Sequence, residues 1–220
     1  GDYDCDGITA TAVITSILRA LGGDATPHLA TRRAGAYGLS DPALARVMAT
    51  KPSVLITCDC GSSDHPRVWA AKQAGIDVIV IDHHLVPSEP LPALAFLNPH
   101  RPECGFPYKW LASCGLALSM GAALRKALDK PLDLRPLLDL VAIGTIADVA
   151  PLTGDNRVLV RAGLAVLAQG RRPGLRVLGE RAKVGLGQPV VAEDVAFRFA
   201  PRLNAPGRLG DPGATPATAG

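Results

Sequence analysis

The chain has few aromatic residues, no long hydrophobic run and no even set of cysteines. Aromatic residues make up 4% of its 220 residues and hydrophobic residues 48%, a balance typical of a globular protein with a sizeable core. A membrane-spanning helix needs about 20 consecutive apolar residues, and no run of that length is present. The sequence therefore predicts no membrane partner. We recognise no secretory signal, and we expect the chain to be a piece of a longer protein.

The five cysteines argue against a disulfide framework. An odd number without paired spacing is typical of reduced thiols, so we expect a cytoplasmic protein. Cys58 and Cys60 form a lone C-x-C pattern, and a structural zinc site would need a second matching pair.

Positive charge is unevenly distributed along the chain. Residues 151–220 carry ten Lys and Arg against five Asp and Glu, whereas residues 1–150 carry thirteen against fifteen. A basic flank beside an acidic cleft would suit a phosphate-bearing polymer. A solvated helical surface explains the same excess equally well, so charge alone does not decide between these interpretations.

The first hundred residues alternate between apolar strands and helices. We expect helices at 8–21, 41–48 and 64–74, and strands at 25–30, 53–58, 77–81 and 94–97. The runs at 53–58 and 77–81 are continuously apolar, as in strands buried on both faces. This order predicts an α/β fold with a parallel β-sheet and helices on both faces. A first strand is expected before Gly1, outside the chain.

Beyond residue 110 the pattern is helical. We expect helices at 110–128, 134–147, 155–168, 173–180 and 192–199. Residues 211–220, rich in Gly, Pro, Ala and Thr, predict a linker or disordered tail. The expected organisation is one domain over 1–210, with an α/β part over about 1–100 and a helical part over about 110–200.

Acidic residues and histidines gather in short clusters. Asp2, Asp4 and Asp6 lie within five residues, and like charges this close raise one another's pKa. A bound divalent cation is the usual reason to keep such a cluster. Two adjacent histidines, His83 and His84, point to the same chemistry, because imidazole and carboxylate together suit transition metals such as manganese.

Two further carboxylates fit this interpretation. Asp59 follows a predicted strand, at the edge where open α/β sheets bind ligands. Asp148 ends an apolar helix, where an unpaired carboxylate is unfavourable unless a cation neutralises it. Each residue has an ordinary alternative role, such as a helix cap, a turn residue or a core histidine. Together they predict a metal-dependent enzyme with enough ligands for two divalent cations: Asp4, Asp6, Asp59, His83 and Asp148.

The sequence resembles the DHH phosphoesterase superfamily, and within it the RecJ-type single-strand-specific exonucleases. Five stretches carry the resemblance, in order along the chain. They are Gly-Asp-Tyr-Asp-Cys-Asp-Gly from Gly1, Ile-Thr-Cys-Asp-Cys-Gly ending at Gly61, Asp82-His83-His84, Val-Ala-Ile-Gly-Thr-Ile-Ala-Asp-Val-Ala-Pro-Leu ending at Leu152, and Pro-Arg-Leu-Asn-Ala-Pro-Gly-Arg-Leu-Gly-Asp from Pro201. Cys60 stands where the family more often has Asn.

The resemblance implies a DHH catalytic domain over 1–210 and a role for each metal ligand. Asp4 and Asp6 would bind one ion each, and Asp59 would bridge the two ions. His83 and Asp148 would complete the shell of one ion. Mn²⁺ is the implied ion, two per site, with Mg²⁺ as the alternative because carboxylate-rich sites also bind it.

Other residues would act on the substrate. His84 would face the scissile phosphate as a hydrogen-bond donor, and Asp82 would orient its neighbours. Arg202, Asn204 and Arg208 would contact substrate phosphates, since Arg presents a bidentate fork to phosphate oxygens. The alternative for these three is a capped turn between a helix and a linker.

The implied activity is 5′→3′ exonuclease action on single-stranded DNA in repair and recombination, by two-metal activation of water. A helicase and a single-strand-binding protein are implied as partners by resemblance alone. One alternative is a DHH phosphodiesterase for short oligonucleotides or cyclic dinucleotides. The other is a non-catalytic replication scaffold, which would be expected to have lost ligand positions that are intact here. Because the second domain of the family is outside the chain, we expect this fragment to bind metal but to degrade DNA poorly.

Overall fold

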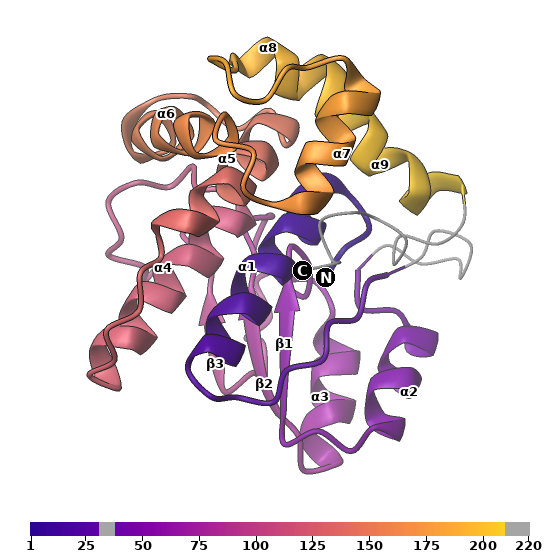
Figure 1. The fold of residues 1–220 in the computed structure, drawn as a ribbon. Helices are drawn as coiled ribbons and strands as arrows, with labels where there is room; N and C mark the ends of the chain where they lie inside the picture. Colours follow the sequence, from indigo (N-terminus) through magenta and orange to yellow (C-terminus); the bar gives the residue numbers. More distant parts are fainter. Residues whose placement is uncertain (31–37, 210–220) are drawn as a thin grey trace.

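A three-stranded parallel sheet lies at the centre of the molecule (Figure 1). The computed structural model describes residues 1–30 and 38–209, so the expected tail at 211–220 lies outside the described residues. Strands β1 (Val54–Cys58), β2 (Asp77–Ile81) and β3 (Ala95–Leu97) pair in the order β1-β2-β3. Cys58 is opposite Ile81, so the carboxyl ends of β1 and β2 are level. The predicted parallel sheet is confirmed.

Helices cover both faces of the sheet. Side chains alternate along each strand, so each strand can contribute to a core on either face. Ile56, Cys58 and Ile81 pack into one core with α1 (Cys5–Ala20), α4 (Ser113–Ala127) and α5 (Leu138–Ala147). Val78 and Val80 face the opposite way, into a second core with α2 (Asp41–Ala49) and α3 (His65–Gln73). The predicted α/β architecture with two covered faces is confirmed.

The strand predicted at 25–30 is wrong, because these residues form no regular secondary structure. Among the described residues its backbone-to-backbone hydrogen bonds are both with Gly1: the terminal amino group donates to the His28 carbonyl at 2.7 Å, and Ala30 N donates to Gly1 O at 2.9 Å. On the other side, Asp2 N donates to Cys58 O at 3.1 Å. A strand needs a partner several residues long, and in the described part of the chain only Gly1 and Asp2 connect the segment to β1 by backbone hydrogen bonds.

The second half of the chain is helical, as predicted. After the 3-10 turn Arg135–Leu137 come α5, α6 (Gly154–Leu167), α7 (Pro173–Ala182), α8 (Ala192–Asp194), the π-helical turn Val195–Phe199 and α9 (Ala200–Leu209). No helix within the described ranges is both long enough and apolar enough to span a membrane.

The predicted C-terminal boundary of the last helix is wrong. The sequence predicts a stop at residue 199, yet α9 continues to Leu209 with Pro206 inside it. Packing outweighs the helix-breaking signal here: Leu203 is fully buried, and a Cβ at Gly207 would lie 2.5 Å from the Tyr3 carbonyl oxygen. Only glycine permits this close approach, which brings α9 beside the acidic stretch Gly1–Gly7.

Helix α5 is the centre of the helical half. All residues from Asp139 to Ile146 are buried, and α1, α4 and α6 pack around the helix. It lies close to α6 at Gly163, where a Cβ would lie 2.1 Å from the Leu138 carbonyl oxygen. The two helices can therefore approach only because residue 163 has no side chain.

Substitution of Gly163 by Ala should destabilise the protein. The added methyl group meets backbone rather than a flexible side chain, so α5 and α6 must separate. We expect a net loss of about 1–2 kcal/mol in the free energy of unfolding, after the gain in helix propensity is subtracted. Urea unfolding would measure the loss. Gly105→Ala, where a Cβ meets nothing within 4 Å, is the control and should change stability little. Equal stability of both variants would contradict this account of the α5–α6 contact.

Candidate metal centre

The polar site lies at the carboxyl ends of the sheet strands. Asp59 directly follows β1, and Asp82 directly follows β2. The sheet hydrogen bonding continues into them, because Asp59 N donates to Ile81 O at 2.9 Å and Asp82 N to Leu97 O at 3.1 Å. Asp59 has a φ of 62°, which is uncommon for a residue with a side chain and turns the chain sharply at the strand end. The sheet thus fixes both carboxylates at one edge, as predicted.

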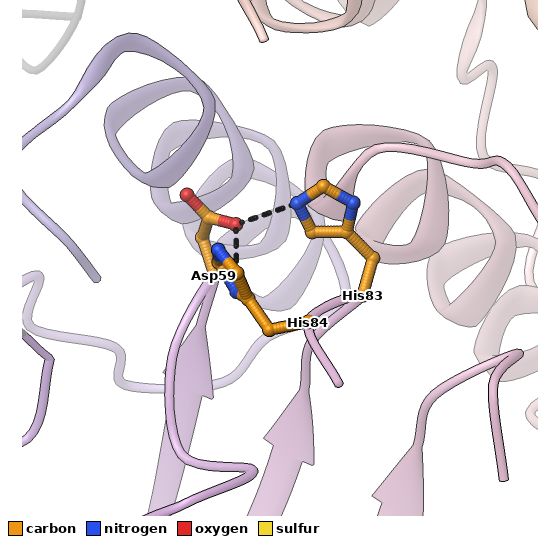
Figure 2. A group of neighbouring side chains, drawn as sticks. All are labelled: Asp59, His83 and His84. Carbon is orange, nitrogen blue, oxygen red and sulfur yellow. Dashed lines mark ion pairs between the residues drawn. The ribbon is translucent and has the colours of Figure 1, made fainter. Parts of the chain in front are cut away.

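Two histidines flank the Asp59 carboxylate (Figure 2). His83 Nε2 lies 3.3 Å from Asp59 Oδ1, and His84 Nδ1 lies 3.9 Å from the same oxygen. His83 Nε2 is buried and has no hydrogen-bond partner among the described residues. Burial lowers the pKa of His83, which favours the neutral imidazole that metals bind.

Asp82 holds the histidine pair in place. Its Oδ1 accepts hydrogen bonds from His83 N at 2.8 Å and His84 N at 3.2 Å, and it lies 2.7 Å from His84 Nδ1. Ser62 N donates to its Oδ2 at 2.9 Å. Burial alone would raise the pKa of Asp82, but the bonds from His84 and Ser62 outweigh burial and lower it to about 2. The hydrogen bond to Asp82 in turn raises the pKa of His84.

Asp6 links the first motif to α4. Its two carboxylate oxygens accept from Ser113 N at 2.7 Å and Cys114 N at 2.9 Å, which are free donors at the start of α4. The Ser113 hydroxyl also donates to Asp59 Oδ1 at 2.9 Å. A Cβ at Gly144 on α5 would lie 2.9 Å from Asp6 Oδ1, so glycine is needed behind this carboxylate.

Asp148 is the C-cap of α5 and joins the cluster from the side opposite the sheet. Its Oδ2 lies 3.7 Å from His83 Nε2, and Asp6 Oδ2 lies 3.9 Å from the same nitrogen. Burial, followed by the negative charges of Asp6 and Asp4, raises the pKa of Asp148 to about 7. The position and the electrostatic penalty both agree with the sequence prediction.

Asp2 and Asp4 complete the acidic cluster. Asp4 is the N-cap of α1, and its Oδ1 accepts from Gly7 N at 3.0 Å. Asp2 is fully buried, and its Oδ2 has no hydrogen-bond partner in the described part of the chain. Burial and the charge of Asp4 raise the pKa of Asp2. The structure places the Asp2 carboxylate beside Asp4 and Asp59, although the ligand set predicted from the sequence did not include Asp2.

Three overlapping groups of side chains offer ligand atoms within 4.8 Å of one another. They are Asp59, His83 and His84; Asp6, His83 and Asp148; and Asp2, Asp4 and Asp59. Burial raises the pKa of Asp59 and Asp6, and neighbouring acids raise that of Asp59 further. A divalent cation fits this set, because it would relieve the repulsion and engage the unpartnered His83 Nε2 and Asp2 Oδ2. Cys58 and Cys60 belong to none of the three groups found among the described residues.

Two supporting residues escaped the sequence prediction. Ser113 reaches Asp59 only because α4 packs against α1, and the structure begins α4 at Ser113, three residues after the predicted start at 110. Asn98 follows β3, and its Nδ2 donates to His84 O at 2.8 Å and to Ser62 Oγ at 3.1 Å. A polar residue at the end of a third strand could have been read in the same way as Asp59.

The predicted phosphate-contacting residues lie on α9 rather than in a turn. Arg202 is exposed, and its Nη1 donates to Arg198 O at 2.8 Å. Asn204 Oδ1 is buried and has no partner among the described residues. The side chain of Arg208 lies outside the described part. Through Gly207 this helix contacts Tyr3, between Asp2 and Asp4.

Comparisons with known sequences identify the family of this chain and several relatives. Residues 1–145 match the model of the DHH family, N-terminal domain. The single-stranded-DNA-specific exonuclease RecJ of Dickeya dadantii is 43% identical over 225 residues, which cover 96% of this chain and 38% of the relative. The protein of the same name from Bacillus subtilis is 38% identical over 210 residues, covering 95% of this chain and 26% of the relative. The chain thus spans well under half the length of these relatives.

Solved structures show the same fold. A crystal structure of exonuclease RecJ bound to manganese has a TM-score of 0.87 and 36% identity, and the match covers 98% of this chain and 54% of that one. RecJ from Thermus thermophilus in complex with Mn²⁺ has a TM-score of 0.80 and 35% identity, with 100% and 32% covered. A complex of RecJ from the same organism with Mg²⁺ has a TM-score of 0.66 and 33% identity, with 100% and 29% covered.

The raised pKa of Asp148 predicts a pH-dependent stability in metal-free protein. Its folded-state pKa of about 7 lies above the usual value of 3.8, so the folded state retains a proton that the unfolded chain has lost. Stability should therefore fall as the pH rises from about 4 to 7. Asp148→Asn should remove part of this fall. Its free energy of unfolding should exceed that of the wild type by on the order of a few kcal/mol at pH 7 and by little at pH 4.

Thermal unfolding in chelator across this pH range would measure the effect. Asp24→Asn, at an exposed position after α1, is the control and should follow the wild-type curve. Parallel curves for Asp148→Asn and wild type would contradict the raised pKa.

Proposed function

We propose that this chain, which belongs to the DHH family, is the catalytic core of a metal-dependent phosphodiesterase that degrades single-stranded DNA from the 5′ end. The observation that carries the proposal is the cluster of carboxylates around His83 at the strand ends. Buried atoms of His83 and Asp2 in this cluster have no hydrogen-bond partner among the residues that the structure describes. The RecJ relatives support the substrate class. Because the chain spans only part of those relatives, the activity, the polarity and a role in repair and recombination are proposals for this chain.

Five side chains would hold two divalent cations: Asp4, Asp6, Asp59, His83 and Asp148. Asp2 lies close enough to Asp4 and Asp59 to assist them. We propose Mn²⁺ as the ion, with Mg²⁺ as the alternative, since RecJ structures have been solved with each. Such cations, when bound, lower the pKa of a coordinated water and stabilise charge on phosphoryl oxygens.

Other residues of the chain would orient the metal ligands and supply a hydrogen-bond donor to the phosphate. Asp82 accepts hydrogen bonds from both histidine backbones, so the loop after β2 cannot rotate freely. The hydrogen bond to Asp82 raises the pKa of His84, which favours the protonated imidazole and suits a donor facing the scissile phosphate. The amides of α4 fix the Asp6 carboxylate, and the Ser113 hydroxyl fixes that of Asp59. The ligands are thus held in place before any ion arrives.

Arg202, Asn204 and Arg208 are proposed to contact phosphates of the DNA. The support is their helix, which lies against Tyr3 and therefore beside the acidic cluster. We further propose that residues 1–210 form one catalytic domain, because a single core cluster includes residues from Cys5 to Leu203. The helicase and single-strand-binding partners and the cytoplasmic location stay predictions.

Hydrolysis in Mn²⁺ tests the proposal directly. A 5′-phosphorylated single-stranded oligonucleotide would be compared with its duplex and with a thymidine dinucleotide. We expect wild-type cleavage to favour the single strand. Asp59→Ala should reduce the rate by at least about a thousandfold, because Asp59, like His83, belongs to two of the three groups. Asp24→Asn should leave the rate unchanged.

Each other outcome selects among the alternatives. Cleavage of the dinucleotide alone would favour the short-oligonucleotide phosphodiesterase. Mn²⁺ binding by calorimetry without cleavage of any substrate would favour an incomplete catalytic fragment or a scaffold. A rate in Asp59→Ala equal to that of the wild type would refute the proposed site.

The Ser113 hydroxyl provides a second test. Ser113→Ala removes the hydrogen bond to Asp59 Oδ1 but leaves the backbone donors to Asp6 in place. We expect Mn²⁺ affinity to fall about tenfold by calorimetry, as for other residues that orient ligands. Ser119→Ala, on the same helix with its hydroxyl bonded to Gly115 O, is the matched control. If both variants bind Mn²⁺ like the wild type, Ser113 does not orient the site.

A further inference from the structure

Helix α5 ends in a left-handed turn at Val149, directly after Asp148. Val149 N donates to Ile146 O at 3.1 Å, and Ala150 N donates to Thr145 O at 3.3 Å. This pair of bonds defines a Schellman motif, in which the first residue beyond the helix adopts a positive φ. Val149 has a φ of 59°. The turn fixes the backbone on which Asp148 enters the metal centre.

The same pair of hydrogen bonds ends four other helices of this chain. The positive-φ residue is Gly22 after α1, Gly75 after α3, Asp129 after α4 and Lys183 after α7. Glycine adopts this conformation without strain, Asp tolerates it, and an unbranched lysine is crowded less than a β-branched side chain. Among these five turns in the described ranges, Val149 alone is β-branched, so its side chain is the least suited to its backbone.

Burial does not compensate for this strain. The Val149 side chain is 87% exposed, so it gains almost nothing from packing within the chain. A residue that violates a local preference without a compensating contact is typical of a functional position. The neighbouring acidic site has a parallel feature: Leu85, directly after His84, is 86% exposed. Two large apolar side chains thus follow two residues of the metal centre and face solvent.

We propose that Val149 contacts the apolar surface of the nucleoside next to the scissile phosphate. The inference rests on the proposed function. A nucleotide whose phosphate lies at the metal centre extends a base and a deoxyribose away from it, and both present carbon surfaces. An exposed apolar side chain beside Asp148 is placed to cover such a surface, and Leu85 offers a second one beside His84. Contact with substrate gives the reason for a valine where glycine would relieve the strain.

Two substitutions separate the side chain from the backbone. Val149→Thr keeps the β-branched shape and the strain but replaces a methyl group by a hydroxyl. We expect it to raise the KM for a thymidine dinucleotide in Mn²⁺ about three- to tenfold, with kcat little changed. Val149→Gly removes both side chain and strain, so KM should rise at least as much while Tm increases by about 2–4 °C. Lys183→Gly, at the same position of the α7 turn, should raise Tm less and leave KM unchanged.

A dinucleotide that lacks one base would show whether Val149 contacts the base or the deoxyribose. If the base is touched, the effect of Val149→Thr disappears on a dinucleotide that lacks one base. If the deoxyribose is touched, the effect persists, and either result supports the proposal. Mn²⁺ affinity by calorimetry should be unchanged in Val149→Thr, since the ligands are intact.

Two results would overturn the inference alone. One is an unchanged KM in both Val149 variants while the wild type hydrolyses the dinucleotide normally. The other is a loss of Mn²⁺ affinity in Val149→Thr comparable to that of Asp59→Ala, which would show that residue 149 acts by positioning Asp148. Wild-type hydrolysis no faster than that of Asp59→Ala would instead refute the proposed function, and this inference with it.

Discussion

Repulsion among buried carboxylates around one histidine is the main physical constraint on this fold. Asp6 and Asp148 both approach His83 Nε2 within 4 Å, and Asp59 approaches it more closely. Each of these carboxylates has a raised pKa because burial disfavours its charge. A group that disfavours its own ionisation stays in such a place only if rigid elements hold it there.

The fold supplies these rigid elements by bringing helix ends and strand ends to one point. The amide groups at the start of α4 donate to the Asp6 carboxylate, and the sheet hydrogen bonds fix Asp59 and Asp82. Glycines permit the close approaches: a Cβ at Gly144 would crowd Asp6, and one at Gly7 would lie 2.6 Å from Asp2 O. The same residues that make the site possible therefore limit which side chains its surroundings can have.

Sequence reasoning succeeded where local pattern and burial agree. The apolar runs that became β1 and β2 could be predicted because strands buried on both faces have no polar positions. It failed at 25–30, where the strand lacks a partner of sufficient length, and at the end of α9, where packing of Leu203 and Gly207 outweighs the effect of Pro206. Both errors concern contacts between distant residues, which no local preference encodes.

The order of residues was enough to predict that Asp59, Asp82 and His83 lie together, because strand ends and motif spacing bring them to one edge of a parallel sheet. How these side chains are held depends on packing in three dimensions. Ser113 lies 54 positions from Asp59 along the chain, and Asp148 reaches His83 only because α5 is buried beside α1 and α4. The strained turn at Val149 was likewise not predictable from the sequence, because its positive φ accompanies two backbone hydrogen bonds that only the structure shows. The sequence determines which residue types are present and in what order, whereas packing determines the distances and orientations of the side chains in the candidate metal centre.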